Sequence, residues 1–168
     1  MRTKLMSVIA IASVALGCHL SAVGPSRERE LFSRVKITSS TGDKTIIPLG
    51  NGLTIVNLYD DFCSECPTGN RFQTMERLNS LRSGTTQIFV VFSDQHFSTQ
   101  DVENFKAMLS MPEALVQGDI EALKPYLIRG KLLVVFDSTR SAVWQEKPGM
   151  TEQEVLKEVS QLMQTPSN

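Results

Sequence analysis

Two cysteines separated by two residues, Cys63 and Cys66, are the side chains of this sequence best suited to chemistry. They follow the mostly apolar run Leu53–Tyr59 and precede a segment with helical periodicity, so we expect them at the start of a helix. Unpaired N–H groups at a helix N-terminus favour negative charge, which lowers the pKa of a thiol there below its usual value of about 8.5. Because the thiolate is the nucleophile in disulfide exchange, we predict that Cys63 attacks and that Cys66 resolves.

Two other roles are open to a pair of cysteines with this spacing. A zinc site needs four ligands, and the rest of the chain offers only Cys18, His19 and His96, so zinc is the weaker alternative. A static structural disulfide suits an exported protein. However, a bond that closes so short a loop removes little conformational entropy from the unfolded chain, which makes it a poor stabilising link. Redox exchange is therefore the leading hypothesis.

The N-terminus has the pattern of an export signal. Arg2 and Lys4 precede the apolar stretch Leu5–Leu16, which has the length of a signal-peptide core and is too short for a comfortable membrane span. The stretch ends at Gly17-Cys18 and resembles the bacterial lipobox, which implies that Cys18 is lipidated and becomes the mature N-terminus. We expect a lipoprotein of the bacterial cell envelope that faces the periplasm; ordinary cleavage to a free periplasmic protein is the alternative.

Composition and charge set the class of the remaining chain. The 168 residues are 41% hydrophobic and 21% charged, which is typical of one globular domain. A net charge of −1 and the lack of a long Lys/Arg cluster argue against nucleic acid as the main partner. We predict a signal peptide at 1–17, a tether at 18–30 and a single domain at 31–168.

Hydrophobic periodicity after residue 30 alternates between that of strands and that of helices. Strands are expected at 34–39, 45–49, 53–59, 87–92, 132–136 and 141–145, and helices at 64–82, 99–109, 119–127 and 151–163. Ser98 or Thr99 is a candidate helix cap, and Thr151 followed by Glu154 forms a capping-box pattern. This order of elements predicts an α/β fold with a mixed central sheet and helices on both faces.

The segment Ile55–Pro67 resembles the active-site segment of thioredoxin-fold proteins, and in particular that of the exported TlpA/ResA-like thiol–disulfide oxidoreductases. Asn57, six residues before the first cysteine, matches that branch, whereas thioredoxin itself has Asp there. The resemblance implies a thioredoxin-like fold and electron exchange with a protein thiol or disulfide partner in the envelope. It also implies that no organic cofactor is needed, since the electrons reside in the cysteine pair.

The sequence departs from this family at the loop expected to face the cysteines. The family has a cis-proline just before the strand that corresponds to Leu132–Phe136, and that place falls near Gly130-Lys131, where there is no proline. In the family this proline pairs with the substrate peptide and shields the thiols from metals, so its absence predicts more open thiols. It also supports a further alternative, a non-catalytic thioredoxin-fold adaptor with a structural disulfide.

Charged residues near the cysteines indicate a direction of electron flow. Three carboxylates, those of Asp60, Asp61 and Glu65, lie within three residues of the first cysteine. Like charge disfavours a thiolate, and strong oxidants of this type depend on a stabilised thiolate, so we predict a reductant. Lys131 would offset the acidic charge if its loop faces the site, and the alternative is that all these charges are solvated loop residues. The residues expected to tune the site are Asn57, Asp60, Asp61, Glu65 and Lys131.

His96 follows the apolar run 87–92 and is expected in a loop at the carboxyl edge of the sheet, where sites gather in open α/β folds. Two thiolates and an imidazole suit Cu(I). The copper-delivering Sco proteins also have a thioredoxin fold and resemble this chain in a CP-type cysteine motif, although their motif is CxxxC. A copper site of Cys63, Cys66 and His96 is therefore an alternative, and a plain loop position is the simpler interpretation of the histidine.

Overall fold

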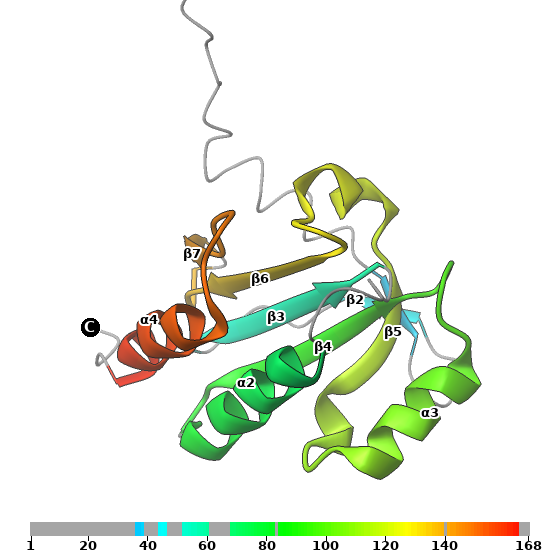
Figure 1. The fold of residues 1–168 in the computed structure, drawn as a ribbon, viewed down its shortest axis with the longest axis horizontal. Coiled ribbons are helices and arrows are strands. Elements are labelled where there is room, and N and C mark those ends of the chain that lie inside the picture. Colours follow the sequence, from blue (N-terminus) through cyan, green and yellow to red (C-terminus); the bar gives the residue numbers. More distant parts are fainter. Residues whose placement is uncertain are drawn as a thin grey trace, which may run out of the picture.

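A computed structural model describes residues 36–38, 44–46, 52–60, 68–82, 84–139 and 141–164 of the chain, with the backbone alone at 36–38, 44–46 and 68–70. These residues form a seven-stranded sheet in the order β2-β1-β5-β4-β3-β6-β7 (Figure 1). The strands are β1 (Lys36–Thr38), β2 (Lys44–Ile46), β3 (Thr54–Tyr59), β4 (Gln87–Ser93), β5 (Leu115–Asp119), β6 (Lys131–Phe136) and β7 (Ala142–Gln145). The helices are α2 (Thr68–Leu81), α3 (Thr99–Met108) and α4 (Glu152–Gln164), with 3₁₀ turns η1 (Pro112–Ala114) and η2 (Glu121–Tyr126).

The sheet is mixed, as the sequence predicted. Strand β3 pairs with β4 in parallel, and β4 pairs with β5 in parallel. Strand β6 runs antiparallel to β3, β7 runs antiparallel to β6, and β1 and β2 add an antiparallel hairpin beside β5. The carboxyl ends of β3 and β4 and the amino end of β6 therefore meet at one edge of the sheet.

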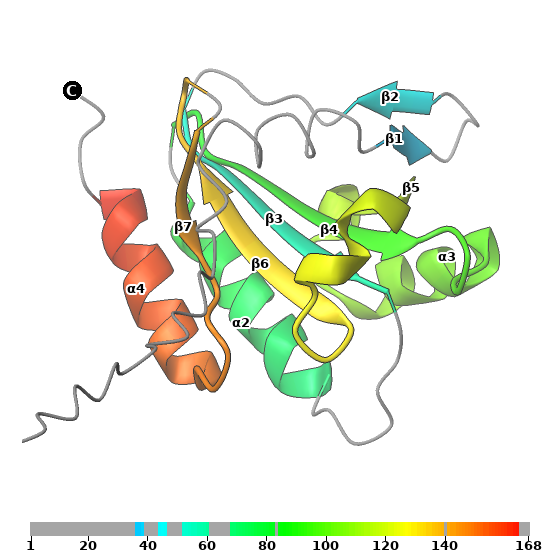
Figure 2. The same cartoon turned by 90° about the horizontal axis from the view of Figure 1, so that it is seen from above.

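Strand β3 is the centre of the molecule, and all six of its side chains are buried. Alternate residues point to opposite faces: Ile55 and Tyr59 join one hydrophobic cluster, while Val56 and Leu58 join the other. The first cluster packs against α2, α3 and α4, and Figure 2 shows α4 lying beside α2 along this face. The second cluster is covered by the 3₁₀ helix η2. The expected α/β fold with a mixed sheet is confirmed, but the described α-helices all pack on the first face, and the second face has only this short 3₁₀ helix.

Aromatic rings fill the space between β4 and the helices. Phe92 stacks on Tyr59 with ring centroids 5.5 Å apart and on Phe105 with centroids 5.1 Å apart. Phe72 of α2 and Phe97, in the loop between β4 and α3, complete the group. Such side chains bury about 150–250 Å² each, so this cluster anchors α2 and α3 to the carboxyl half of β4.

Two capping predictions are confirmed. Ser98 and Asp101 form a reciprocal capping box at the start of α3, in which the Asp101 N–H donates to Ser98 Oγ at 3.2 Å and the Ser98 N–H donates to Asp101 Oδ2 at 2.8 Å. Thr151 and Glu154 form the same arrangement before α4, with the Thr151 N–H donating to Glu154 Oε2 at 2.8 Å. Both caps satisfy N–H groups that have no partner within the helix.

The sequence missed two elements, the 3₁₀ turn η1 and strand β5. The short helix expected at 119–127 is present as the 3₁₀ helix η2, which contains Pro125. Strand β5 contains Gly118 and a glutamine, so its own strand propensity is low. Its parallel pairing with β4 on one side and antiparallel pairing with β1 on the other determine its conformation, which is a tertiary effect.

The N-terminal predictions fall on residues that the structure does not describe. The signal peptide at 1–17, with Cys18 after it, and the tether at 18–30 lie outside the described ranges and stay predictions. Within those ranges, no helix has the length and apolar character needed to cross a membrane.

Candidate functional site

The candidate site lies at the edge where β3 and β4 end and β6 begins. The segment 61–67 connects Asp60, at the end of β3, to Thr68, at the start of α2. Cys63, Cys66 and the expected tuning residues Asp61 and Glu65 belong to this segment and lie outside the described residues. The described structure thus gives the two ends between which the cysteines are held and the groups that surround those ends.

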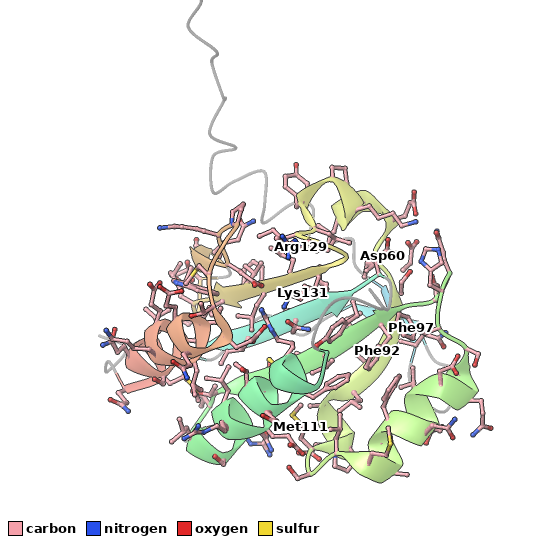
Figure 3. All side chains as sticks on the ribbon, in the orientation of Figure 1. Asp60, Phe92, Phe97, Met111, Arg129 and Lys131 are labelled. Atoms are coloured by element: carbon pink, nitrogen blue, oxygen red, sulfur yellow. The ribbon has the colours of Figure 1, made fainter. Side chains whose placement is uncertain are left out.

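A tight turn lies next to the carboxyl end of β3, at the place where the resemblance predicts a cis-proline. The Asp60 N–H donates to the carbonyl of Gly130 at 2.8 Å, which joins this turn to the end of β3. Ile128 and Lys131 close the turn by exchanging backbone hydrogen bonds of 2.7 and 3.2 Å. The two central residues, Arg129 and Gly130, have φ values of 51° and 73°, as in a two-residue type I′ turn. The described residues contain no cis peptide bond, and Figure 3 shows Asp60, Arg129 and Lys131 at this edge.

A buried arginine is the centre of the polar contacts behind this edge. Arg71, in the first turn of α2, is 1% exposed. Its Nη1 donates to Asn57 Oδ1 at 3.0 Å, and its Nη2 donates to Glu146 Oε1 at 2.6 Å. Its Nε lies 3.0 and 2.8 Å from the two carboxylate oxygens of Glu152. Burial alone lowers the pKa of Arg71, but the hydrogen bond and charge of Glu146 outweigh it, so the pKa is raised and the guanidinium stays charged.

The two carboxylates have further partners. Glu146, which is 4% exposed, accepts a second hydrogen bond from the backbone N–H of Leu133 at 3.2 Å. Glu152 accepts from Lys131 Nζ at 2.8 Å. Burial raises the pKa of Glu152, but the charges of Arg71 and Lys131 lower it further than burial raises it, so this carboxylate stays ionised. We call Arg71, Lys131, Glu146 and Glu152 the Arg71 network; its two cations and two carboxylates have no net charge.

A second polar group surrounds the carboxylate of Asp60 at the surface of the same edge. His96 Nδ1 lies 2.7 Å from the carbonyl oxygen of Asp60 and 3.3 Å from its Oδ1. Lys124 Nζ lies 3.8 Å from the same Oδ1 and also pairs with Glu121 at 2.7 Å. A carbonyl oxygen only accepts, so Nδ1 must carry the hydrogen, and in the neutral imidazole the lone pair is then on Nε2.

Three of the expected tuning residues can therefore be placed. Asn57 is fully buried and binds Arg71, so it belongs to the support of α2. The carboxylate of Asp60 contacts His96 and Lys124, which reduces the effect of its negative charge on neighbouring groups. Lys131 does begin in the turn beside Asp60, but its ammonium is paired with Glu152.

Sequence reasoning missed Arg71, Glu146 and Glu152. A signal for the arginine was present, because Arg71, Met75 and Leu78 are spaced by four and three residues and share one face of α2. A charged residue on an apolar helical stripe must be paired when it is buried. The two glutamates gave no comparable signal, since one follows an edge strand and the other begins a helix, where acidic residues are common.

The described residues contain no group of three or more His, Cys, Asp or Glu that could hold a metal ion. The cysteines fall outside that search, and His96 is a described histidine that contacts Asp60, the residue to which the cysteine segment is attached. A neutral imidazole whose Nδ1–H is bound to a backbone carbonyl is the usual arrangement of a histidine that ligates metal through Nε2.

Neither the family models nor the curated proteins gave a match to the sequence. Solved structures do match. The exposed lipoprotein thioredoxin of Streptococcus pneumoniae is 14% identical, with 76% of this chain and 98% of that chain covered at a TM-score of 0.52. Yeast Sco1 with copper bound is 12% identical, with 79% and 91% covered at a TM-score of 0.54. The thioredoxin domain of a thiol-disulfide oxidoreductase from Bacteroides vulgatus is 12% identical, with 78% and 94% covered at a TM-score of 0.54.

The chain has a thioredoxin-like fold. These similarities extend over most of both chains in each comparison, so the fold class expected from the sequence is confirmed. Identities of 12–14% identify the fold alone, and the chemistry must be argued from the residues of this chain.

Proposed function

We propose that the protein is an exported thiol–disulfide oxidoreductase that exchanges electrons with a partner protein through Cys63 and Cys66. The observation that carries this proposal is the position of the C-x-x-C pair, between the end of central strand β3 and the start of α2 in a thioredoxin-like fold. The N–H groups at the start of α2 favour negative charge on a nearby thiol, as thiolate attack requires.

The proposed reaction transfers two electrons. The Cys63 thiolate attacks one sulfur of a partner disulfide, which forms a mixed disulfide and releases the other partner sulfur as a thiolate. The Cys66 thiolate then attacks the sulfur of Cys63 and releases the second partner sulfur. The partner has gained two electrons as a dithiol, and Cys63 and Cys66 are joined as a disulfide. A dithiol protein of the envelope is required to reduce this disulfide for the next cycle.

We propose that the protein acts as a reductant. Asp61 and Glu65 are each two residues from Cys63 along the sequence and disfavour its thiolate. The cation expected to offset them, Lys131, has its ammonium 2.8 Å from Glu152, which counters its charge. A destabilised thiolate favours the disulfide form and gives a reducing pair.

The envelope location is part of the same proposal. Its support is the export pattern of residues 1–17 and the lipobox-like end at Cys18. One protein of similar fold is itself an exposed lipoprotein. We propose that Cys18 carries the lipid and that the tether of residues 18–30 holds the domain at the membrane surface on the periplasmic side.

A redox titration of the full chain tests the proposal. In a Cys18→Ser background only the C-x-x-C thiols remain, and alkylation with a mass shift after equilibration in glutathione or dithiothreitol buffers counts them. A reversible two-electron couple between about −180 and −300 mV supports exchange, and the low end of that range supports a reductant. A pair that stays oxidised well below about −300 mV contradicts it and favours the adaptor with a structural disulfide.

Trapping the partner is the complementary experiment. With Cys66→Ser the mixed disulfide on Cys63 cannot be resolved, so a disulfide-linked partner should be recovered from cells at native expression. The matched control is Cys63→Ser, which removes the attacking thiol and should recover none. Equal recovery with the two variants would contradict the assigned roles.

Copper binding is the second candidate, and the orientation of His96 favours it. The Nδ1–H of this residue is directed to the Asp60 carbonyl, which leaves Nε2 to act as a ligand beside the cysteine segment. Two thiolates and an imidazole fit Cu(I), and yeast Sco1, which has a similar fold, has been solved with copper bound. This candidate predicts one Cu(I) retained per chain through gel filtration, with loss in Cys63→Ser, Cys66→Ser and His96→Ala alike.

A further inference from the structure

Three buried polar atoms beside the Arg71 network have no hydrogen-bond partner among the described residues. They are the amide nitrogen Nδ2 of Asn57, the hydroxyl oxygen of Tyr59 and the carboxylate oxygen Oε2 of Glu152. Asn57 is fully buried and Tyr59 is 2% exposed. About nine in ten buried polar groups in proteins are paired, and an unpaired one destabilises the fold. Three such atoms around one network therefore point to a bound partner.

The orientation of the Asn57 amide is fixed by Arg71. Arg71 Nη1 lies 3.0 Å from Asn57 Oδ1, and because a guanidinium only donates, the atom that faces it must be the carbonyl oxygen. The other end of the amide is then the NH₂ group, whose N–H bonds meet no acceptor in the described part of the chain. Asn57 thus presents unused donors inside the protein.

The hydroxyl of Tyr59 lies beside this amide. The two residues are two apart in β3, so their side chains share one face of the sheet with Cα atoms about 6.6 Å apart. Burial raises the pKa of Tyr59, so the hydroxyl stays protonated and is a further donor. Asn57 is near enough to lower that pKa in part, although the two side chains do not meet in hydrogen-bond geometry.

Glu152 offers the acceptor that these donors lack. Its Oε1 already accepts from Arg71 Nε at 3.0 Å and from Lys131 Nζ at 2.8 Å. Its Oε2 is 2.8 Å from Arg71 Nε, but the Nε–H bond is directed at Oε1, so Oε2 has unused lone pairs. Burial is the largest cause of the raised pKa of Tyr59, and the charge of Glu152 adds to it, so this carboxylate acts on the same hydroxyl.

We propose that Asn57, Tyr59 and Glu152 form a binding site for one buried water molecule. The water accepts from the amide and the hydroxyl and donates to the carboxylate, and three hydrogen bonds are typical of a buried water. Two such bonds of about 2.8 Å span up to about 5.6 Å, which suits side chains that stand two residues apart on one strand.

The charges around the site favour a neutral ligand. An anion would face the carboxylates of Glu146 and Glu152, and a cation would face the guanidinium of Arg71. Asn57 and Tyr59 belong to β3, whereas Glu152 begins α4, so the water connects the central strand to the last helix. The inference does not depend on the chemistry proposed for the cysteines.

Contacts with water in solution test the site directly. In a rotating-frame Overhauser spectrum of the ¹⁵N-labelled full chain, we expect a dipolar cross peak between water and the side-chain N–H protons of Asn57. Its sign is opposite to that of peaks from proton exchange. Tyr59→Phe removes the hydroxyl that could relay exchange, and the peak should persist because two partners of the water remain. A missing peak in the native protein, or its loss in Tyr59→Phe, would overturn the proposal.

Two substitutions of Glu152 test the third hydrogen bond. Glu152→Gln keeps a carbonyl oxygen and should keep the cross peak, whereas Glu152→Leu has no acceptor and should lose it. A peak of equal intensity in Glu152→Leu would overturn the role of the carboxylate. The dispersion of the amide signals verifies that each variant is folded, and if Glu152→Leu is not, the native protein and Tyr59→Phe decide the matter.

Urea unfolding distinguishes a bonded hydroxyl from an unpaired one. Tyr59→Phe keeps the ring that stacks on Phe92 and removes the oxygen alone. Loss of a bonded hydroxyl should lower the unfolding midpoint by about 0.5 M. A midpoint that stays or rises would mean that the hydroxyl has no partner, and would overturn the proposal. The matched control is Tyr126→Phe, which removes the hydroxyl of a partly exposed tyrosine in η2 and should leave the midpoint unchanged.

Discussion

Replacing Arg71 by Met should destabilise the protein more than almost any other single change to a charged residue. The guanidinium is the partner of two carboxylates and an amide, and it is 1% exposed. In Arg71→Met, Glu146 would remain 4% exposed with only the Leu133 N–H to satisfy it, while Glu152 would keep Lys131. Removing one partner of a buried ion pair costs about 3–5 kcal/mol, because an uncompensated charge is left inside.

Urea unfolding of the reduced full chain measures this loss. With a slope of about 2 kcal/mol per M, a loss of about 4 kcal/mol lowers the unfolding midpoint by about 2 M. The matched control is Arg82→Met, which removes an arginine at the other end of the same helix. Arg82 and Glu113 are 3.3 Å apart with side chains 41% and 56% exposed, and an exposed pair of this kind contributes about 0–1 kcal/mol.

The pH dependence gives an independent check. In the native protein the pKa of Glu152 is lowered, so the stability it contributes is present above the unfolded-state pKa and is lost as the pH falls through the folded-state value. In Arg71→Met the charge that lowers the pKa of Glu152 most is lost, so the variant has less of this pH-dependent stability. The difference in unfolding free energy between the wild-type protein and Arg71→Met should therefore be smaller at pH 4 than at pH 7.

Two results would refute this reasoning. A midpoint for Arg71→Met within error of that for Arg82→Met would mean that the buried contacts contribute no more than an exposed pair. A difference in unfolding free energy that is constant from pH 4 to pH 7 would mean that the loss of stability comes from lost packing of the arginine side chain and not from an unpaired carboxylate.

Three further predictions concern the scaffold, and each is checked by the same urea titration. Gly52→Ala should lower the free energy of unfolding more than Gly84→Ala. Both glycines have positive φ, but a Cβ at Gly52 would also lie 2.8 Å from the carbonyl oxygen of Thr85, whereas nothing lies within 4 Å of a Cβ at Gly84. We expect a loss of about 1 kcal/mol at Gly84 and of at least about 2 kcal/mol at Gly52, and equal losses would contradict this. Ser98→Ala removes the cap of α3 and should cost about 1 kcal/mol, with Ser98→Thr restoring most of it. Phe92→Ala removes a fully buried ring that stacks on two others and should cost about 3–5 kcal/mol; a loss below about 1 kcal/mol would show that the core collapses into the gap.

The sequence predicted most of the fold because its strongest signals are local. Strand β3 and strand β6 are nearly continuous apolar runs, and both are buried on both faces as expected. The caps at Ser98 and Thr151 are interactions between residues three apart, which a sequence states directly. Strand β5 could not be predicted in this way, because its conformation depends on pairing with β4 and β1 on either side.

The candidate site was predictable only where the signal lay within a few residues. The cysteine pair and its neighbouring carboxylates are contiguous, but the cysteines lie outside the described residues and stay a prediction. The place where the family has its cis-proline followed from counting back along β6, and the structure has the turn of Arg129 and Gly130 there. The partners of Asn57 and Lys131 were not predictable, since Arg71 is 14 residues from Asn57 and Glu152 is 21 residues from Lys131 in sequence. Contacts across such separations depend on how α2, β6 and α4 pack, which a single sequence does not state.

The composition of the Arg71 network argues for a role beyond a net gain in stability. Buried ion pairs are often no more stabilising than well-packed apolar residues of similar volume, because desolvation offsets the attraction between the charges. The same convergence of α2, α4 and β6 could have been built from side chains like those of the adjoining core, where Met75, Val155 and Leu133 are fully buried. What an apolar set could not provide is the directed hydrogen bonds by which Arg71 fixes Asn57, Glu146 and Glu152 relative to one another. The network is therefore better explained by the one arrangement of α2, β7 and α4 that these bonds specify than by the free energy that they add.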